Sequence, residues 1–378
     1  MLSRRSVLKA MTFSGLAPAV VRAEPGVSDQ EILIGRTTPA SPPITEMTMQ
    51  RRGGADACIA AVNAMGGIHG RRIRIIDRDD AYDAVRADAN VRELIDNIGV
   101  FAMLGAYGTH TLPTIMSRVE LAGVPLIGAV TLGRDDRDPP KRFVFPVRVS
   151  AQTETSHIVR HQRTLGVTRF AILANTDAYG PEGAIEFADA LKEAGLKPVV
   201  TINMTFQDSG ELAARKLLES GAEAILASTI PQTLASVLRP YRAQYGVAKA
   251  LGFSSMRVED LMSTLGPLCS GVGLSEAVPV PTRIGVPIVK EYQTALRAHL
   301  PGAAPSYLGL DGYLEARVLV EGLRRAGRGL TRMGLVEGLE SMGYHDFGGV
   351  NVRYGRGDRT GSTFVEVVML GNNGRIIY

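Results

Sequence analysis

The sequence predicts an α/β protein built from two Rossmann-like lobes, each with a parallel sheet flanked by helices, joined by a multi-strand hinge. Three observations predict this class: short apolar runs alternate with helical patterns, the alternation restarts near residue 150, and the chain exceeds one ordinary core. Alternating strands and helices favour parallel sheets covered by helices on both faces. About 355 residues behind an N-terminal leader suit two domains.

The N-terminal segment predicts export. Residues 1–23 carry the paired Arg4 and Arg5, then Lys9, a short apolar run over residues 10–21, and Ala23 after Arg22. A charged region, an apolar region and a small-residue cleavage site are typical of a signal peptide. The two arginines suit twin-arginine export, and an ordinary export signal is the alternative.

Removal of this leader changes the charge balance. The whole chain has 42 Lys and Arg against 38 Asp and Glu, and four of the basic residues lie in residues 1–23. The remaining chain therefore carries equal numbers of each sign. A nucleic-acid partner has no electrostatic support, and none is expected.

The first series of elements begins after the leader. Strands are expected at residues 32–36, 73–76, 100–104 and 124–129. Between them, Val91, Leu94, Ile95 and Ile98 form one apolar stripe at helical spacing, which a sheet must cover.

The series restarts after residue 149. Strands are expected at residues 170–174, 199–204, 224–228 and 250–253. A helix begins near Pro181 and ends at Gly195, which are good boundary residues.

Long helices over residues 286–299 and 310–326 and a strand-rich tail complete the chain. We expect lobe one to comprise residues 27–149 and 279–351, and lobe two residues 150–278 and 352–378. No low-complexity linker joins them, so several short crossings are expected, an arrangement that suits hinge bending.

The two cysteines are not expected to pair. Cys58 falls in a helical pattern, where a buried thiol behaves as a small apolar side chain. A bridge to Cys269 is open in an oxidising compartment, but nothing in the sequence brings the two together.

Candidate catalytic and metal-binding motifs are incomplete. His157 and His161 lie one helical turn apart but have no third ligand, so a solvated helix face is favoured over a metal site. The segment 252–256 lacks the final glycine of a nucleophile elbow. Asp79 and Asp80 are adjacent, which favours a turn over acid–base chemistry. We therefore expect no enzyme activity, no cofactor and no metal.

Several motifs lie in the order of one known family. They are residues 54–56 and 60–70 (Gly-Ala-Asp, then Ala-Ala-Val-Asn-Ala-Met-Gly-Gly-Ile-His-Gly), 79–83 (Asp-Asp-Ala-Tyr-Asp), 124–127 (Val-Pro-Leu-Ile), 175–180 (Asn-Thr-Asp-Ala-Tyr-Gly) and the strand at 224–228. From about residue 32 to residue 371 the chain resembles the leucine/isoleucine/valine-binding protein family. The resemblance implies the type I periplasmic-binding fold and a role as substrate-binding protein of an ABC transporter.

The resemblance also implies where a ligand binds. Family members hold the ligand's carboxylate with the loops that match residues 105–111 and 128–131. The positions that match are Thr109 in the first loop, and Ala129 and Thr131 in the second. His110 and Tyr107 of the first loop are further candidates. A helix expected near Pro113 has unpaired N–H groups that favour an anion, and capping of that helix by a threonine is the alternative for Thr109.

Further candidates come from other loops of the resemblance. Met47 matches a ligand-contacting position after the first strand, with core packing as the alternative. Tyr179 matches a position that faces the cleft and would supply an apolar ring and a hydroxyl. Thr229 and Ser254 follow lobe-two strands and would close over the ligand's body.

Two departures from the family bear on the ligand. Amino-acid binders of the family hold the ammonium with an acidic residue where this chain has Ser254. A buried ammonium without a carboxylate is costly, so an amine-free acid is favoured and a branched-chain amino acid comes second, unless Asp311 substitutes. In addition, Tyr82 and Tyr107 occupy the positions of a family disulfide, and the two rings could pack together.

The sequence therefore predicts a monomeric periplasmic protein that captures a small carboxylate and delivers it to an ABC permease in the inner membrane. One alternative is a periplasmic sensor for a membrane receptor. Another is an exported enzyme acting on a small acid.

Overall fold

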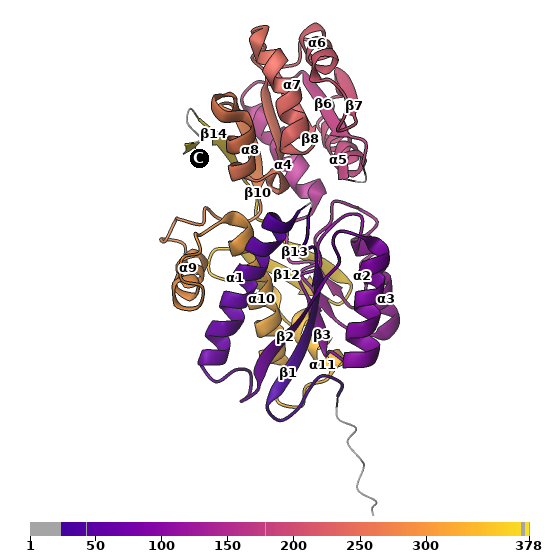
Figure 1. Cartoon of the computed structure of the whole chain (residues 1–378), viewed down its shortest axis with the longest axis vertical. Coiled ribbons are helices and arrows are strands. Elements are labelled where there is room, and N and C mark those ends of the chain that lie inside the picture. The colour runs from indigo at the N-terminus through magenta and orange to yellow at the C-terminus, as the bar shows by residue number, and fades with distance from the viewer. Residues whose placement is uncertain (1–23, 43, 178, 372–374, 378) are drawn as a thin grey trace, which may run out of the picture.

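Two parallel sheets organise the molecule, one in each lobe (Figure 1). The computed structural model describes residues 24–42, 44–177, 179–371 and 375–377. The expected export signal over residues 1–23 lies outside these ranges. The α/β class with helix-flanked parallel sheets is as the sequence predicts.

The lower lobe in Figure 1 contains a five-stranded parallel sheet of order β2-β1-β3-β4-β5. Its strands are β1 (Glu31–Thr38), β2 (Arg72–Asp79), β3 (Ala102–Leu104), β4 (Leu126–Ile127) and β5 (Val144–Phe145). Its helices are α1 (Thr45–Ala64), α2 (Ala84–Arg92), α3 (Leu112–Ala122), α9 (Pro287–His299), α10 (Tyr307–Ala326) and α11 (Arg332–Glu340).

The upper lobe contains a seven-stranded sheet of order β15-β14-β10-β9-β8-β6-β7, in which β14 and β15 run antiparallel to their neighbours. Its strands are β6 (Phe170–Asn175), β7 (Val200–Met204), β8 (Ala224–Ser228), β9 (Lys249–Phe253), β10 (Val272–Glu276), β14 (Glu366–Leu370) and β15 (Ile376–Ile377). Its helices are α4 (Ala151–Thr164), α5 (Tyr179–Glu193), α6 (Gly210–Ser220), α7 (Pro231–Ala243) and α8 (Val258–Leu265).

A small antiparallel sheet spans the boundary that the sequence analysis expects between the two lobes. It consists of β11 (Gly343–Asp346), β12 (Asn351–Gly355) and β13 (Asp358–Ser362). The boundary expected between residues 351 and 352 would cut β12, yet Tyr354 packs edge-on against Phe145 and donates a hydrogen bond to Pro146 O. Because a strand pair cannot be divided without losing its ladder, we place the last change of lobe after Ser362.

Local sequence signals account for most element boundaries. Asp83, Ser150 and Ser306 cap helices α2, α4 and α10 by accepting backbone N–H bonds. The apolar stripe from Val91 to Ile98 is helical as predicted, but its second half, Glu93–Ile98, is a π-helical turn. That irregularity has no counterpart in the apolar spacing.

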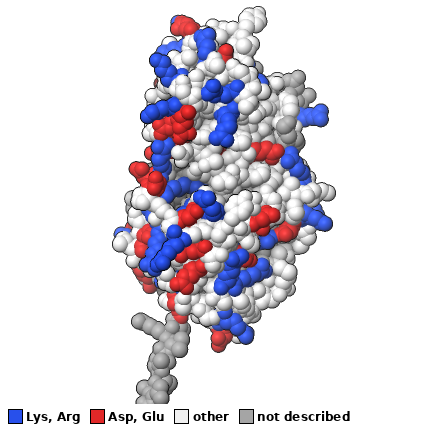
Figure 2. Space-filling model, turned by 180° about the vertical axis from the view of Figure 1, so that it is seen from behind, with Lys and Arg blue, Asp and Glu red and all other residues white. Residues whose placement is uncertain are grey.

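The cysteines, the surface charges and the apolar helices can also be compared with the sequence analysis. Cys58 and Cys269 are separate buried thiols, as expected. Basic and acidic side chains intermingle over the face seen in Figure 2. Within the described ranges, no helix combines the length and apolar character needed to cross a bilayer.

Helices α1 and α10 cross at glycine. A Cβ atom at Gly54 would overlap the backbone of Gly309, and one at Gly312 would overlap the backbone of Arg51. The two helices therefore touch backbone to backbone, which places the side chains of their first turns at the edge of the interlobe cleft.

We expect Gly54→Ala to lower the free energy of unfolding by about 1–3 kcal/mol, because the added methyl group must force the two helices apart. The matched control is Gly53→Ala, whose Cβ would lie 3.6 Å from Leu300 Cδ1. The control should be neutral or stabilising by up to ~1 kcal/mol, because alanine is the better helix former. Urea unfolding of both variants measures the difference, and equal effects would contradict the close crossing.

Candidate ligand-binding site

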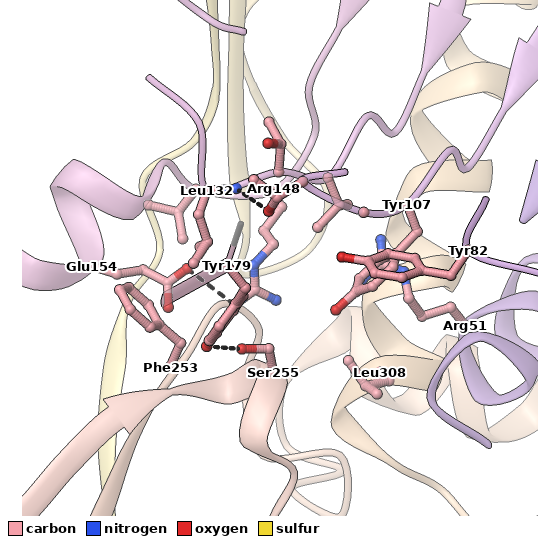
Figure 3. Close-up of a pocket in the computed structure, with 15 residues that line it drawn as sticks. Arg51, Tyr82, Tyr107, Leu132, Arg148, Glu154, Tyr179, Phe253, Ser255 and Leu308 are labelled. Carbon is pink, nitrogen blue, oxygen red and sulfur yellow. Dashed lines mark hydrogen bonds and ion pairs between the residues drawn. The ribbon is translucent and has the colours of Figure 1, made fainter. Parts of the chain in front are cut away.

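A cavity lies between the lobes at the carboxyl ends of their strands (Figure 3). The empty space in it, counted out into open solvent, is about 540 Å³. In open α/β sheets, ligands bind at this edge, where loops lead from strands into helices. The lining residues from both lobes are Arg51, Tyr82, Tyr107, Gly108, Thr109, Val130, Thr131, Leu132, Arg148, Val149, Glu154, Tyr179, Phe253, Ser255 and Leu308.

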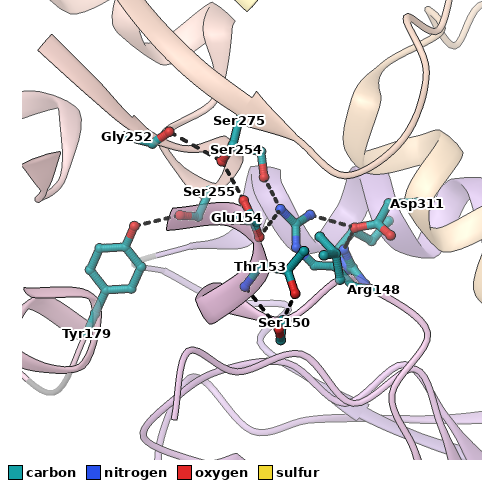
Figure 4. A network of polar contacts seen from close by, with 12 residues as sticks. Arg148, Ser150, Thr153, Glu154, Tyr179, Gly252, Ser254, Ser255, Ser275 and Asp311 are labelled. Atoms are coloured by element: carbon teal, nitrogen blue, oxygen red, sulfur yellow. Dashed lines mark hydrogen bonds and ion pairs between the residues drawn. The ribbon is translucent and has the colours of Figure 1, made fainter. Parts of the chain in front are cut away.

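Arg148 lies at the centre of this cavity and joins the two lobes (Figures 3 and 4). It belongs to the segment that crosses from β5 to α4, just before the α4 cap Ser150. Its Nη1 donates to Asp311 Oδ2 of α10 at 3.0 Å, and its Nη2 donates to Glu154 Oε1 of α4 at 3.1 Å. Nη2 also donates to Ser254 Oγ after β9. The guanidinium is thus bonded to lobe one and lobe two at once.

A second guanidinium lies beside it. Arg51 of α1 donates from Nη1 to Asp311 and from Nη2 to Glu315, and all three side chains are almost fully buried. Its guanidinium carbon also lies 5.6 Å from the centre of the Tyr107 ring, within the range of a cation–π contact. Asp311 Oδ2 therefore accepts bonds from both arginines.

Burial and pairing set the charges of this cluster. Burial opposes ionisation of Asp311, but Arg51 and Arg148 hold the pKa of its carboxyl below its ordinary value. Burial raises the pKa of Glu315 to about 8 against the opposing effect of Arg51. At neutral pH Asp311 is therefore ionised, whereas Glu315 is mostly protonated.

Glu315 also supports the loop after β4. Gly128 in that loop has a φ of 82°, and a Cβ there would lie 2.6 Å from Glu315 Cδ. Only glycine combines this backbone conformation with so close an approach. The loop that begins at Gly128 is consequently seated on the buried carboxyl group.

Aromatic side chains form much of the wall. Tyr82 and Tyr107 come from lobe one, and Tyr179 and Phe253 from lobe two. Burial raises the pKa of Tyr82 to about 12 and also raises the pKa of Tyr107 and of Tyr179. All three phenols are therefore neutral hydrogen-bonding groups at physiological pH. The Tyr179 hydroxyl shares a 2.7 Å hydrogen bond with Ser255 Oγ.

Four residues from the sequence prediction line the cavity. They are Tyr107, Thr109, Thr131 and Tyr179. The Thr109 hydroxyl accepts a long bond from Leu132 N, 3.4 Å, and donates to no described residue. It therefore has a proton available for a ligand.

Thr131 differs from Thr109 in this respect. The Thr131 hydroxyl donates to Asp136 Oδ2 at 2.7 Å and accepts from Gly133 N at 3.0 Å. Because its single proton is used within the loop, Thr131 shapes the loop and has none left for a carboxylate.

Five other predicted residues lie outside the lining set, which consists of described residues only. Ala129 and Thr229 are buried, Met47 is half-buried on α1, and His110 is exposed, with its ring centre 6.1 Å from that of Tyr82. The fifth, Ser254, is buried beneath Arg148, and its neighbour Ser255 lines the cavity instead. Tyr82 and Tyr107 both line the cavity, and the Tyr82 ring also pairs with His110.

Asp311, the acid that could replace the missing acidic residue, is paired with both arginines. Its Oδ2 accepts from Arg51 and Arg148, and its Oδ1 is fully buried without a partner among the described residues. An ammonium group would have to compete with both arginines at Oδ2.

The sequence analysis missed both arginines and Glu154. A signal for Arg51 exists, because it lies in phase with the buried positions Ala55, Cys58 and Val62 of α1. Arg148 is the single charge in an apolar run between two elements. A charged residue on an apolar stripe or run must find a buried partner.

The comparisons with known proteins agree on one family. A family model described as "Periplasmic binding protein" matches residues 31–375. "Leu/Ile/Val-binding protein homolog 8" of Brucella abortus is 22% identical over 352 residues, which cover 87% of this chain and 85% of that protein.

Solved structures show the same fold over nearly the whole chain. A possible leucine/isoleucine/valine-binding protein from Rhodopirellula baltica SH 1 matches with a TM-score of 0.81 and 25% identity, over 93% of this chain and 96% of that chain. A substrate-binding periplasmic protein from Ralstonia solanacearum matches with a TM-score of 0.81 and 28% identity, over 92% and 99%.

We expect the free energy of unfolding to fall as the pH rises from about 4.5 to about 8, because of Glu315. In this range the unfolded carboxyl releases its proton while the folded one keeps it. In Glu315→Gln this loss should be smaller by at least about 1.4 kcal/mol, the equivalent of one pKa unit. Urea unfolding of both proteins at pH 5 and pH 8 measures it, and parallel pH profiles would contradict the buried protonated carboxyl.

Proposed function

The chain belongs to the periplasmic binding protein family, of the leucine/isoleucine/valine-binding type, and we propose that it captures a small amine-free carboxylate for an ABC importer. The ligand would bind between the open lobes, and the closed form would be presented to a permease in the inner membrane. The proposed place of action is the periplasm, and the proposed state is a monomer. The matched family is one of binding proteins, which favours capture over turnover.

The observation that carries this proposal is an excess of hydrogen-bond donors over free acceptors in the cavity. A guanidinium has five N–H groups, of which Arg148 uses three and Arg51 uses two on described residues. The Thr109 proton is unused as well. Unused donors around a cavity favour a ligand rich in acceptors, and a carboxylate offers the strongest such bonds.

The carboxylate of the cavity lining, by contrast, is fully paired. Glu154 Oε1 accepts from Arg148, and Glu154 Oε2 accepts from the Ser275 hydroxyl (Figure 4). Behind it, Asp311 Oδ2 is held by two arginines, and Asp311 Oδ1 is buried. A buried ammonium that finds no free carboxylate loses much of its hydration energy without compensation. This disfavours a free α-amino acid.

Both lobes contribute residues to the lining of the cavity, which supports closure of the lobes on a ligand. Thr109 and Tyr107 come from lobe one, whereas Tyr179 and Ser255 come from lobe two. A ligand that touches both sets stabilises the closed arrangement over the open one, which is the differential contact that closure requires.

We expect amine-free acids to raise the melting temperature, and their α-amino counterparts to leave it unchanged. Suitable pairs are 4-methyl-2-oxopentanoate with leucine, and 3-phenylpropanoate with phenylalanine. Binding at a hundred times the dissociation constant adds ~2.7 kcal/mol to the free energy of unfolding, which a thermal-shift assay detects. A shift with the amino acids alone would overturn the proposed ligand class.

Thr109→Ala should weaken binding of the best acid by about 10- to 100-fold, the equivalent of one hydrogen bond to a charged acceptor. Thr109→Ser keeps the hydroxyl and is the matched control. Thr131→Ala should have a smaller effect, because the Thr131 proton is committed to Asp136. Titration calorimetry ranks the three, and an unchanged affinity in Thr109→Ala removes this residue from the site.

A further inference from the structure

We infer that the ligand is an aromatic carboxylate, with its charge bound by Arg148 and its ring held between aromatic side chains of the two lobes. This inference rests on the proposed function and names both the substrate class and the residue that selects it.

Arg148 is suited to this role by its unused donors. Its Nε–H and one Nη1–H have no acceptor among the described residues. Its guanidinium points into the middle of the cavity in Figure 3. The side of the guanidinium that carries Nε–H also carries Nη2, whose two N–H groups already donate to Glu154 and Ser254. Each unused N–H group can therefore donate one charge-assisted hydrogen bond to a carboxylate oxygen.

The partners of Arg148 keep it in place. Asp311 holds it from lobe one, and Glu154 and Ser254 hold it from lobe two. Burial opposes its charge, but Glu154 and Asp311 raise the pKa of Arg148 above its ordinary value, so it stays protonated. An anchored cation loses little side-chain entropy when a ligand binds. The carboxylate would thus meet a preorganised charge.

The walls favour a flat, aromatic body. Tyr82, Tyr107, Tyr179 and Phe253 are four of the 15 lining residues, whereas aromatic residues make up 6% of the chain. In lobe two the ring of Phe253 lies 6.3 Å from that of Tyr179, in an edge-on arrangement, and 5.0 Å from that of Phe187. These distances are typical of aromatic pairs. A ligand ring would extend this row toward Tyr107 of the opposite lobe.

The remaining lining side chains fit the same body. Leu132, Val130 and Leu308 add apolar surface to the lining. The charged lining side chains are Arg51, Arg148 and Glu154. The other side chains are aromatic, aliphatic or hydroxyl-bearing, which suits a ring that carries one carboxylate.

The test compares three matched ligand types by titration calorimetry on the purified protein: benzoate and phenylacetate, their cyclohexyl counterparts, and their primary amides. We expect the aromatic acids to bind tightest and the amides at least tenfold more weakly, because a bond to a charged acceptor exceeds a neutral one by about this factor. Cyclohexyl acids that bind as tightly as the aromatic acids would overturn the aromatic assignment.

Arg148→Gln should abolish the preference for acid over amide and leave the affinity for the amides unchanged. The control is Arg118→Gln, which removes an arginine paired with Asp88 outside the cavity and should keep the preference. A loss of acid and amide binding in equal measure would mean that Arg148 only maintains the fold.

A second variant and a comparison of ligand classes separate failure of this inference from failure of the proposed function. If Arg148→Gln does not fold, judged by its melting curve, Arg148→Lys replaces it. This variant retains the charge without the fixed, planar set of N–H donors, so it should weaken the acids and spare the amides. If the wild-type protein binds α-amino acids and no simple acid, the proposed function itself fails, whereas binding of aliphatic acids alone overturns only the aromatic assignment.

Discussion

The architecture of the cleft depends on one constraint, the pairing of charges that are buried where the lobes meet. Arg51 and Arg148 both donate to Asp311, and Arg148 reaches Glu154 and Ser254 on the other side. Removing such charges from water is costly unless each one is bonded. The constraint holds α10 beside α1, where Gly54 and Gly312 permit backbone contact, and it ties the β5–α4 crossing to both lobes.

The same pairing determines which ligand chemistry the cavity favours. It occupies both oxygens of Glu154 and Oδ2 of Asp311 and leaves guanidinium N–H groups unused, because each guanidinium has five N–H donors. The position that the family resemblance assigned to ligand recognition, Ser254, is occupied by this network instead. The same charge pairs therefore join the two lobes and determine which hydrogen-bonding groups remain free for a ligand.

Most strands and helices could be predicted from the sequence because their signals are local. The strand at residues 224–228 is β8 residue for residue. The helix expected near Pro181 is α5, which ends at Glu193, two residues before Gly195 with its φ of 72°. The π-helical turn over Glu93–Ile98 and the small sheet around Tyr354 were not foreseen. Apolar spacing does not distinguish α from π hydrogen bonding, and a late strand can pair with either lobe.

By itself, the sequence determined two α/β lobes, the family resemblance and the loops where a ligand would bind, including Tyr107, Thr109, Thr131 and Tyr179. Only the tertiary structure decided which of those hydroxyl groups has a proton free for a ligand. It also decided which buried charges pair with one another. Arg51 and Asp311 are 260 residues apart, and Arg148 and Asp311 are 163 apart. Periodicity reports which face of an element is buried, whereas the partner of a buried charge is chosen by how distant elements pack against each other.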